Sequence, residues 1–318
     1  MRAVVVGAGS WGTAFAALLR DRGHEVTLAC REAAQARLIA AGGRNTRYLP
    51  VVDLAGIAAS TVEDAPIVDA DLVVVAVPSR VFGAVVRALP GASPVLSLSK
   101  GLDPETGERL STLVGDRPVA VLSGPNIADE VARGLPAAAA VASADESLAG
   151  ELQDVLNSAS LRVYVNPDVV GVELCAAAKN VIALAAGGVD GLGLGDNAKA
   201  ALITRGLAEM ARLGEACGAR PETYAGLAGM GDLIVTCWSA LGRNRRAGEL
   251  IARGSTPEEA SAAIGTVVEG LTTAPVLRDL SHRLGIELPI TEGVCQVLAG
   301  VDLLELASGL MRRMPTEE

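Results

Sequence analysis

Hydrophobic and polar positions divide the chain into two parts with different periodicities. In the first part, short apolar runs rich in β-branched residues alternate with glycine-rich or polar turns, which is typical of strands buried in a parallel sheet. From residue 169 onward, apolar residues recur at helical spacing, with glycine and proline breaks and little strand signal. The predicted strands cover residues 3–6, 25–30, 72–77, 95–98, 119–122 and 161–165, and helices are expected at residues 13–22 and 148–156.

The first predicted strand leads into a glycine-rich loop, and a helix follows. The loop carries Gly7, Gly9 and Gly12 in the spacing GxGxxG. In this spacing the first glycine permits a tight turn, the second lets the backbone approach a pyrophosphate, and the third lets helix and strand pack closely. The amides at the helix N-terminus then bind phosphate. A purely structural glycine turn is the alternative, but the strand before it and the helix after it favour a dinucleotide site.

These patterns together predict an α/β fold with two domains. Residues 1–168 are expected to form a Rossmann-type, mostly parallel sheet domain that binds the dinucleotide. Residues 169–318 are expected to form an all-helical second domain that binds substrate and carries the catalytic group. The last residues, 314–318, are predicted to be a disordered tail.

The end of the second predicted strand bears on the choice of dinucleotide. Arg31 and Glu32 follow this strand directly. An acidic residue here binds the ribose hydroxyls of NAD, whereas an arginine accommodates the extra phosphate of NADP. The pair leaves both cofactors possible and favours acceptance of NADP; the alternative for Arg31 is a solvated residue at a strand end.

Polar residues follow two further strands at the edge of the sheet where the glycine loop lies. Lys100 comes just after the strand at 95–98, and Gly124 and Asn126 come just after the strand at 119–122. Each alone is more often part of a turn than of a site. Because ligands bind at the carboxyl ends of parallel strands, their shared edge makes both candidates for substrate contact.

Lys179 is the candidate for proton transfer. The residues three and four positions from it are small or apolar, so no carboxylate on its own helix face neutralises the amine. The alternative is a lysine whose stem lies along an apolar face while its head reaches water. The chain has only 3 lysines among 27 Lys and Arg residues, and only lysine has an amine that burial can bring into the physiological range of titration. The neighbouring Asn180 offers an amide that can donate and accept.

A second polar cluster lies in the helical part. Asp232 follows a glycine-rich turn, and Gly242, Arg243 and Asn244 follow about ten residues later. Asp232 can orient a lysine, and Arg243 can bind a phosphate with two donors. A solvated basic helix end is the alternative interpretation of these arginines.

Composition and charge narrow the classes of partner. The formal charge of −10 argues against a nucleic-acid surface, although a small anionic substrate remains possible. The five cysteines form no CxxC pair, which fits reduced cytoplasmic thiols without a disulfide or a metal site. No signal peptide or membrane span is expected. A helical domain rich in Ala and Gly suggests a homodimer.

A series of sequence blocks follows in a specific order along nearly the whole chain. The blocks are GAGSWGTA, NTRYLP, AVPS, SLSKGLD, SGPNIADEVARGLP, NPDVVGVELCAAAKNVIALAAG, DGLGLGDNAKAALITRGLAEM, GLAGMGDLIVTC and GRNRRAG. Together they resemble the signatures of the bacterial-type NAD(P)-dependent glycerol-3-phosphate dehydrogenases. The resemblance implies a cytoplasmic enzyme that interconverts sn-glycerol 3-phosphate and dihydroxyacetone phosphate with NAD or NADP and no metal, supplying phospholipid synthesis.

The resemblance also implies roles for individual residues. Lys179 matches the family's proton acceptor. The positions that match substrate contacts are Lys100, Gly124, Asn126, Lys179, Asp232, Gly242, Arg243 and Asn244. The positions that match cofactor contacts, besides the loop glycines, are Ser10, Trp11, Arg31, Tyr48, Lys100, Ala128, Arg243, Val267 and Glu269. Three positions depart from the usual family residues: Gly242 replaces serine, Asn126 replaces serine or threonine, and Ala177 replaces glycine.

To act as a base, Lys179 needs a pKa well below its free value of about 10.4. We expect apolar packing and the cations Lys100 and Arg243 to lower this pKa, and Asp232, if close, to raise it. Two alternatives remain: a lysine-dependent 3-hydroxyacid dehydrogenase of similar architecture, and a dinucleotide sensor without turnover.

Overall fold

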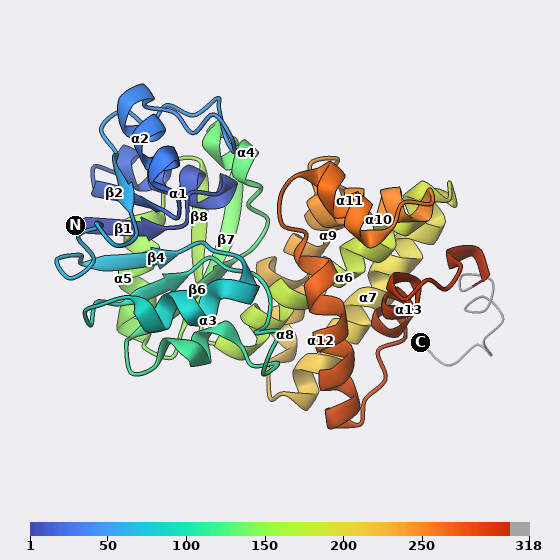
Figure 1. Cartoon of the computed structure of the whole chain (residues 1–318). Helices are drawn as coiled ribbons and strands as arrows, with labels where there is room; N and C mark the ends of the chain where they lie inside the picture. Colours follow the sequence, from blue (N-terminus) through green and yellow to red (C-terminus); the bar gives the residue numbers. More distant parts are fainter. Residues whose placement is uncertain (306–318) are drawn as a thin grey trace.

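The computed structural model describes residues 1–305, and the predicted tail at 314–318 lies outside this range. The chain forms a part built on a β-sheet and, beside it, a part built of helices (Figure 1). The predicted boundary between residues 168 and 169 falls between the last strand, which ends at Asn166, and a long helix that begins at Val169.

The sheet has eight strands in the order β3-β2-β1-β4-β5-β6-β7-β8. All neighbours pair in parallel except β6 and β7, so the predicted fold class of a mostly parallel sheet followed by helices is confirmed. The strands are β1 (Arg2–Val6), β2 (Glu25–Cys30), β3 (Ala58–Thr61), β4 (Leu72–Val75), β5 (Val95–Ser97), β6 (Val119–Ser123), β7 (Ala137–Ser143) and β8 (Leu161–Asn166).

Helices cover both faces of the sheet. Along β1, Ala3 and Val5 belong to the core that includes α1 (Ser10–Asp21), whereas Val4 and Val6 belong to the core on the other face. The remaining helices of this part are α2 (Ala33–Gly42), α3 (Ser79–Ala88), α4 (Ala128–Ala132), α5 (Glu146–Leu156) and the 3-10 helix η1 (Leu110–Val114). Because both faces of the central strands are buried, β1 and β4 contain continuous apolar runs.

Two strands were not predicted, and several element boundaries differ from the prediction: β4 ends at Val75 rather than at residue 77, and α5 begins at Glu146 rather than at residue 148. The sequence pattern did not predict β3 or β7: β3 is a short edge strand, and β7 is built mostly of alanine, which has low strand propensity. The helix α1 begins at Ser10 rather than at residue 13, so the second half of the glycine loop already belongs to its first turn.

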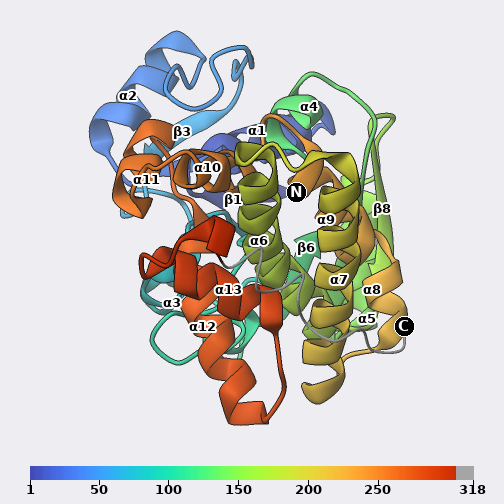
Figure 2. The same ribbon diagram turned by 90° about the vertical axis from the view of Figure 1, so that its right-hand side faces the viewer.

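The helical part is organised around α6 (Val169–Gly191), which carries Lys179 and lies among the other helices (Figure 2). Among the described residues, α6 is the one helix long and apolar enough to cross a membrane, but most of it is buried, as expected of a core helix. The other elements are α7 (Gly195–Ala216), α8 (Pro221–Ala225), the π-helical turn η2 (Leu227–Gly231), α9 (Asp232–Trp238), α10 (Arg243–Ala252), α11 (Pro257–Ile264), α12 (Glu269–Leu284) and α13 (Pro289–Leu298).

Close packing between α6 and α10 depends on two glycines. A Cβ atom on Gly187 would lie 1.9 Å from the carbonyl oxygen of Arg245, and a Cβ atom on Gly248 would lie 1.9 Å from that of Leu184. Side chains at these positions would push the helices apart. The glycines therefore hold α10, which begins with Arg243, against the helix that carries Lys179.

Candidate active site

Lys179 is buried, with 5% of its surface exposed. Its Nζ donates hydrogen bonds to Asp232 Oδ1 (2.7 Å) and to Thr236 Oγ1 (2.9 Å). The helix face around Lys179 is apolar as predicted, but α9 brings the carboxylate from a segment 53 residues away in the chain.

A second lysine binds the same carboxylate from the sheet part. Lys100, in the loop after β5, donates from Nζ to Asp232 Oδ2 (2.8 Å), to Asn126 Oδ1 (3.2 Å) and to the carbonyl oxygen of Gly124 (3.4 Å). One buried carboxylate thus binds two amines, one from each part of the chain. The cluster of Lys100, Lys179 and Asp232 carries an excess of one positive charge when both amines are protonated.

This cluster shifts the pKa values of its members. Burial lowers the pKa of Lys179 to about 8, Asp232 opposes the shift and Lys100 adds to it. Burial alone would raise the pKa of Asp232, but the two amines hold it below its ordinary value. Arg243, which we expected to lower the pKa of Lys179, does not contribute to this shift. Besides burial, the groups that act on this pKa are Asp232 and Lys100.

Asn180 and Asn244 link three helices beside this cluster. Asn244 Nδ2 donates to Asn180 Oδ1 (2.8 Å), and the amide of Gly270 donates to Asn244 Oδ1 (2.9 Å). Asn180 Nδ2 in turn donates to the carbonyl oxygen of Lys100 (3.3 Å). The chain of amides runs from α12 through α10 and α6 to the loop of the sheet part, so it fixes the position of Lys100 relative to Lys179.

Arg243 and its neighbours lie on the side of the helical part that faces the sheet part. Arg243 Nη1 donates to the carbonyl oxygen of Val267 (3.0 Å). Glu269, at the start of α12, accepts from the amide (3.1 Å) and the hydroxyl (2.6 Å) of Ser79 at the start of α3. Burial lowers the pKa of Arg243, and Glu269 opposes that shift. These contacts join α12 to the sheet part.

Gly242 has a steric reason to lack a side chain. It is the N-cap residue of α10, and a Cβ atom there would lie 2.8 Å from the carbonyl oxygen of Thr236. The usual family serine would have to move this backbone. Gly124 has a φ of +142°, and its Cβ atom would lie 2.8 Å from the Cα atom of Ala139, so it is also restricted to glycine.

The glycine loop has the geometry that a dinucleotide requires. Gly7 has a φ of +111°, and a Cβ atom on Gly12 would lie 1.9 Å from the carbonyl oxygen of Gly7. A Cβ atom on Gly9 would meet no atom within 4 Å, so this loop position is open to a ligand. The helix α1 starts directly after Gly9, and no side chain caps its amides. Trp11 Nε1 is buried without a hydrogen-bond partner.

Further predicted cofactor positions of the sheet part lie around this loop or just after β2. Ser10 Oγ donates to the carbonyl oxygen of Tyr48 (3.1 Å). Ala128 begins α4, which packs against α1. Arg31 is exposed and forms an ion pair with Glu32 (2.8 Å) at the end of β2.

Sequence reasoning missed Thr236 and Ser123. Thr236 lies four residues after Asp232 on the same helix face, a spacing that could have revealed it, and it accepts from Lys179. Ser123, the last residue of β6, donates from Oγ to Asp232 Oδ2 (3.1 Å). No local pattern marks Ser123 as a partner of a residue more than a hundred positions away.

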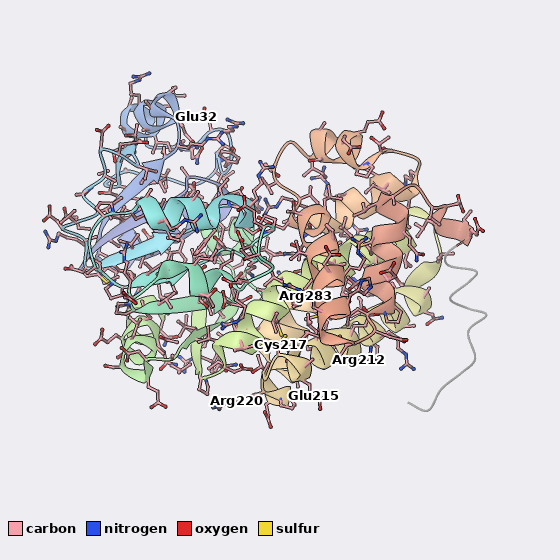
Figure 3. All side chains as sticks on the ribbon, turned by 60° about the horizontal axis from the view of Figure 1, so that its bottom comes forward. Glu32, Arg212, Glu215, Cys217, Arg220 and Arg283 are labelled. Atoms are coloured by element: carbon pink, nitrogen blue, oxygen red, sulfur yellow. The ribbon has the colours of Figure 1, made fainter. Side chains whose placement is uncertain are left out.

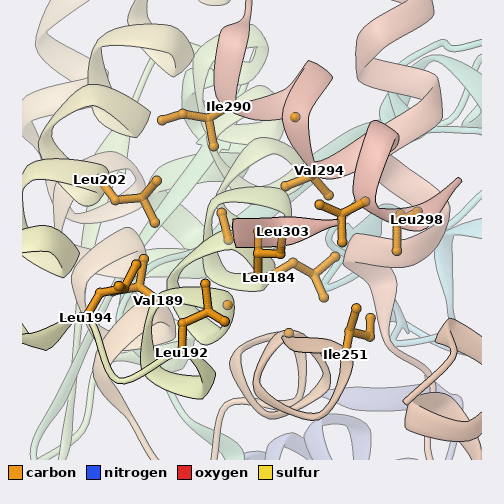
Figure 4. A pocket seen from close by; sticks show the side chains of 15 residues that line it. Leu184, Val189, Leu192, Leu194, Leu202, Ile251, Ile290, Val294, Leu298 and Leu303 are labelled. Carbon is orange, nitrogen blue, oxygen red and sulfur yellow. The ribbon is translucent and has the colours of Figure 1, made fainter. Parts of the chain in front are cut away.

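A pocket in the helical part is not this site. It lies between the C-terminal half of α6, α7, α10 and α13, and the side chains in Figure 4, Leu184, Val189 and Leu298 among them, are apolar. It therefore offers no group for acid or base chemistry. The described residues also contain no group of three or more His, Cys, Asp or Glu side chains that could bind a metal.

Comparisons with known proteins identify relatives of both parts. The family model described as NAD-dependent glycerol-3-phosphate dehydrogenase N-terminus matches residues 2–149, and the corresponding C-terminus model matches residues 168–306. A glycerol-3-phosphate dehydrogenase [NAD(P)+] of Moorella thermoacetica is 48% identical over 99% of this chain and 96% of its own. A protein of the same name from Bacillus cereus is 44% identical over the same shares.

A solved structure agrees with these matches. The crystal structure of glycerol-3-phosphate dehydrogenase from Coxiella burnetii matches with a TM-score of 0.94 and 38% identity, over 98% of this chain and 99% of the other. The resemblance inferred from the sequence blocks is therefore confirmed. This chain belongs to the NAD(P)-dependent glycerol-3-phosphate dehydrogenase family.

Proposed function

We propose that this chain interconverts sn-glycerol 3-phosphate and dihydroxyacetone phosphate, with Lys179 as the proton acceptor. The chain is an NAD(P)-dependent oxidoreductase of the glycerol-3-phosphate dehydrogenase family. The observation that carries the proposal for Lys179 is its buried amine, which meets Lys100 at a single carboxylate, with one lysine from each part of the chain.

Lys179 moves the proton in this proposal. The glycine loop with Gly7, Gly9 and Gly12 would hold NAD(P), which would supply the acceptor for the hydride from carbon 2 of glycerol 3-phosphate. The neutral amine of Lys179 accepts the proton of the carbon 2 hydroxyl, and the charged amine returns it to the carbonyl oxygen in the reverse direction. A pKa of about 8 gives both forms near neutral pH. Asp232 orients the amine, and the charge of Lys100 stabilises negative charge that develops on the reacting oxygen.

The substrate phosphate is assigned to the start of α10. Arg243 supplies two donors, and Gly242 and Asn244 belong to a helix N-terminus that no side chain caps. Gly124 and Asn126 line the substrate on the side of the sheet part. Asn126 supports this assignment because its Nδ2 is buried without a hydrogen-bond partner, so a bound hydroxyl or phosphate oxygen would satisfy it.

The dinucleotide is assigned to the glycine loop and the elements beside it. The residues are Gly7, Gly9, Ser10, Trp11, Gly12, Arg31, Tyr48, Lys100, Ala128, Arg243, Val267 and Glu269. The open space at Gly9 and the uncapped start of α1 support this assignment.

We extend the proposal to the biological setting. The enzyme would supply glycerol 3-phosphate for phospholipid synthesis in the cytoplasm, as a homodimer without nucleic-acid or membrane partners. The family's activity and the formal charge of −10 support this setting.

The test replaces Lys179 with alanine. Reduction of dihydroxyacetone phosphate, followed with NADH and with NADPH, should fall at least about a hundredfold, the lower range for loss of general acid–base catalysis. Binding of NADH, measured by fluorescence, should persist. Retention of more than about a tenth of the turnover would remove Lys179 from proton transfer. Activity of the unaltered chain on hydroxyisobutyrate but not on glycerol 3-phosphate would support a 3-hydroxyacid dehydrogenase instead.

A further inference from the structure

Two arginines flank the carboxylate of Glu32 at the end of β2. Arg31 Nη2 lies 2.8 Å from Glu32 Oε1, and Arg47 Nη1 lies 3.9 Å from the same oxygen. All three side chains are exposed, Arg31 at 86%, Arg47 at 60% and Glu32 at 47%. Figure 3 shows Glu32 at the outer rim of the sheet part, far from Arg283 of the helical part. The cluster has a net charge of about +1.

The segments that carry these arginines are both tied to the glycine loop. Gln35, in the first turn of α2, donates from Nε2 to the carbonyl oxygen of Ala8 (3.0 Å). Asn45 donates from Nδ2 to the same oxygen (2.9 Å), and Ser10 Oγ bonds the carbonyl oxygen of Tyr48 (3.1 Å). Arg31 and Arg47 are therefore held at the rim of the loop, on the side where the end of β2 meets the adenosine ribose of a dinucleotide.

The orientation of Arg47 is restricted further. Its guanidinium lies over the ring of Tyr48, with the central carbon 5.1 Å from the ring centre. An arginine held in this way loses less side-chain freedom when it binds a phosphate than one that is free in solvent.

We propose that Arg31 and Arg47 together bind the ribose 2′-phosphate of NADP, and that Glu32 allows the same site to accept NAD. This inference rests on the proposed dinucleotide binding. Without a 2′-phosphate, Glu32 stays between the two guanidinium groups and accepts a hydrogen bond from the ribose hydroxyl. With a 2′-phosphate, the dianion replaces the carboxylate as the partner of both guanidinium groups, and Glu32 turns outward.

The roles of the three side chains predict opposite effects. Removal of Arg47 should weaken binding of the 2′-phosphate and leave the rest of the nucleotide almost unaffected. Neutralisation of Glu32 should strengthen binding of the 2′-phosphate, because the carboxylate repels it. The same change should weaken binding of a nucleotide with a free 2′-hydroxyl, because the carboxylate accepts a hydrogen bond from that hydroxyl. The enzyme's preference between NADPH and NADH thus depends on the balance of two arginines against one carboxylate.

The test measures equilibrium binding of adenosine 2′,5′-bisphosphate and of adenosine 5′-monophosphate to the full chain by calorimetry. Arg47→Ala should weaken binding of the bisphosphate about tenfold, as expected for loss of one charge-assisted hydrogen bond, and change binding of the monophosphate less than about twofold. Glu32→Gln should strengthen binding of the bisphosphate and weaken that of the monophosphate. The ratio of kcat/KM for NADPH to that for NADH should change in the same directions.

Arg44→Ala is the matched control. Arg44 lies in the same loop and is also exposed, but it donates to the carbonyl oxygen of Pro50 and not to Glu32. Its removal should leave the ratio of the two affinities unchanged. Equal losses for both nucleotides in Arg47→Ala, or the same shift in Arg44→Ala, would overturn the inference. Because binding is measured without substrate, a chain that failed to turn over dihydroxyacetone phosphate would refute the proposed function alone.

Discussion

The pKa of Lys179 predicts how the reaction depends on pH in each direction. Oxidation of glycerol 3-phosphate needs the neutral amine, so its kcat/KM should rise with pH and level off above about 8. Reduction of dihydroxyacetone phosphate needs the protonated amine, so its kcat/KM should be constant below about 8 and fall above it. The two profiles should be mirror images with a common midpoint.

The magnitude follows from the buried cluster. With a pKa of about 8, about one lysine in ten is neutral at pH 7, so kcat/KM for oxidation should be roughly tenfold below its plateau there. A lysine with the ordinary pKa of about 10.4 would give a profile that still rises at pH 9.5. Burial and the neighbouring Lys100 account for the lower value, against the opposing effect of Asp232.

The assay is the initial rate at saturating cofactor between pH 7 and pH 9.5, where the substrate phosphate keeps a constant charge because its second pKa is about 6. Asp232→Asn should move the midpoint of the remaining activity to lower pH, because it removes the carboxylate that raises the pKa of Lys179. Lys199→Arg is the matched control: this buried lysine pairs with Asp190 instead, so the midpoint should stay unchanged.

Two results would refute this reasoning. A midpoint near 10 in the unaltered enzyme would mean that burial does not shift the Lys179 pKa, or that another group transfers the proton. A shift to higher pH in Asp232→Asn would mean that the carboxylate does not stabilise the charged amine. Either outcome would separate the observed ion pair from the proposed chemistry.

Four further substitutions test the fold and the glycine loop. Gly12→Ala should lower the free energy of unfolding, measured in urea, by about 3 kcal/mol, the upper range for overpacking, because its Cβ atom would lie 1.9 Å from a carbonyl oxygen. Gly9→Ala should barely change this free energy but should weaken NADH binding, because the new methyl group fills the open position. Glu173→Ala should cost about 1–3 kcal/mol in a urea titration, since it removes the buried acceptor of hydrogen bonds from η1 and leaves those donors unpaired. Gly242→Ala should lower the free energy of unfolding, measured by thermal denaturation, by about 1 kcal/mol, because its Cβ atom would lie 2.8 Å from a backbone oxygen.

The sequence predicted the elements whose residues carry the local signal and missed those that depend on neighbours. The strand β1 is a run of valines, and its burial on both faces follows from that run. In contrast, β7 is mostly alanine, and it is a strand because β6 and β8 pair with it on either side. Strand propensity weighs the residue alone, so it cannot detect a strand that pairing stabilises.

The same distinction applies to the site. Helical spacing correctly identified the apolar face around Lys179, but spacing on one helix says nothing about which carboxylate another helix brings to that face. Asp232 was a candidate because of the glycines before it, and only the fold joins it to Lys100 as well as to Lys179. Contacts between distant segments arise from tertiary packing, which the local pattern does not contain.

The scarcity of lysine alone does not identify the lysine that transfers the proton. All three lysines of the chain form ion pairs with aspartates, and the two that meet at Asp232 lie where the two parts of the chain join. The third, Lys199, is equally buried, but it pairs with Asp190 and lies over the ring of Trp238, 4.8 Å from its centre. Rarity and burial therefore do not distinguish the proposed catalytic Lys179 from Lys199. Two cations meet at each carboxylate, because Asp190 also binds Arg245 of the helical part. What distinguishes Lys179 is that the second cation at its carboxylate, Lys100, comes from the sheet part, and that burial together with Lys100 lowers its pKa to about 8.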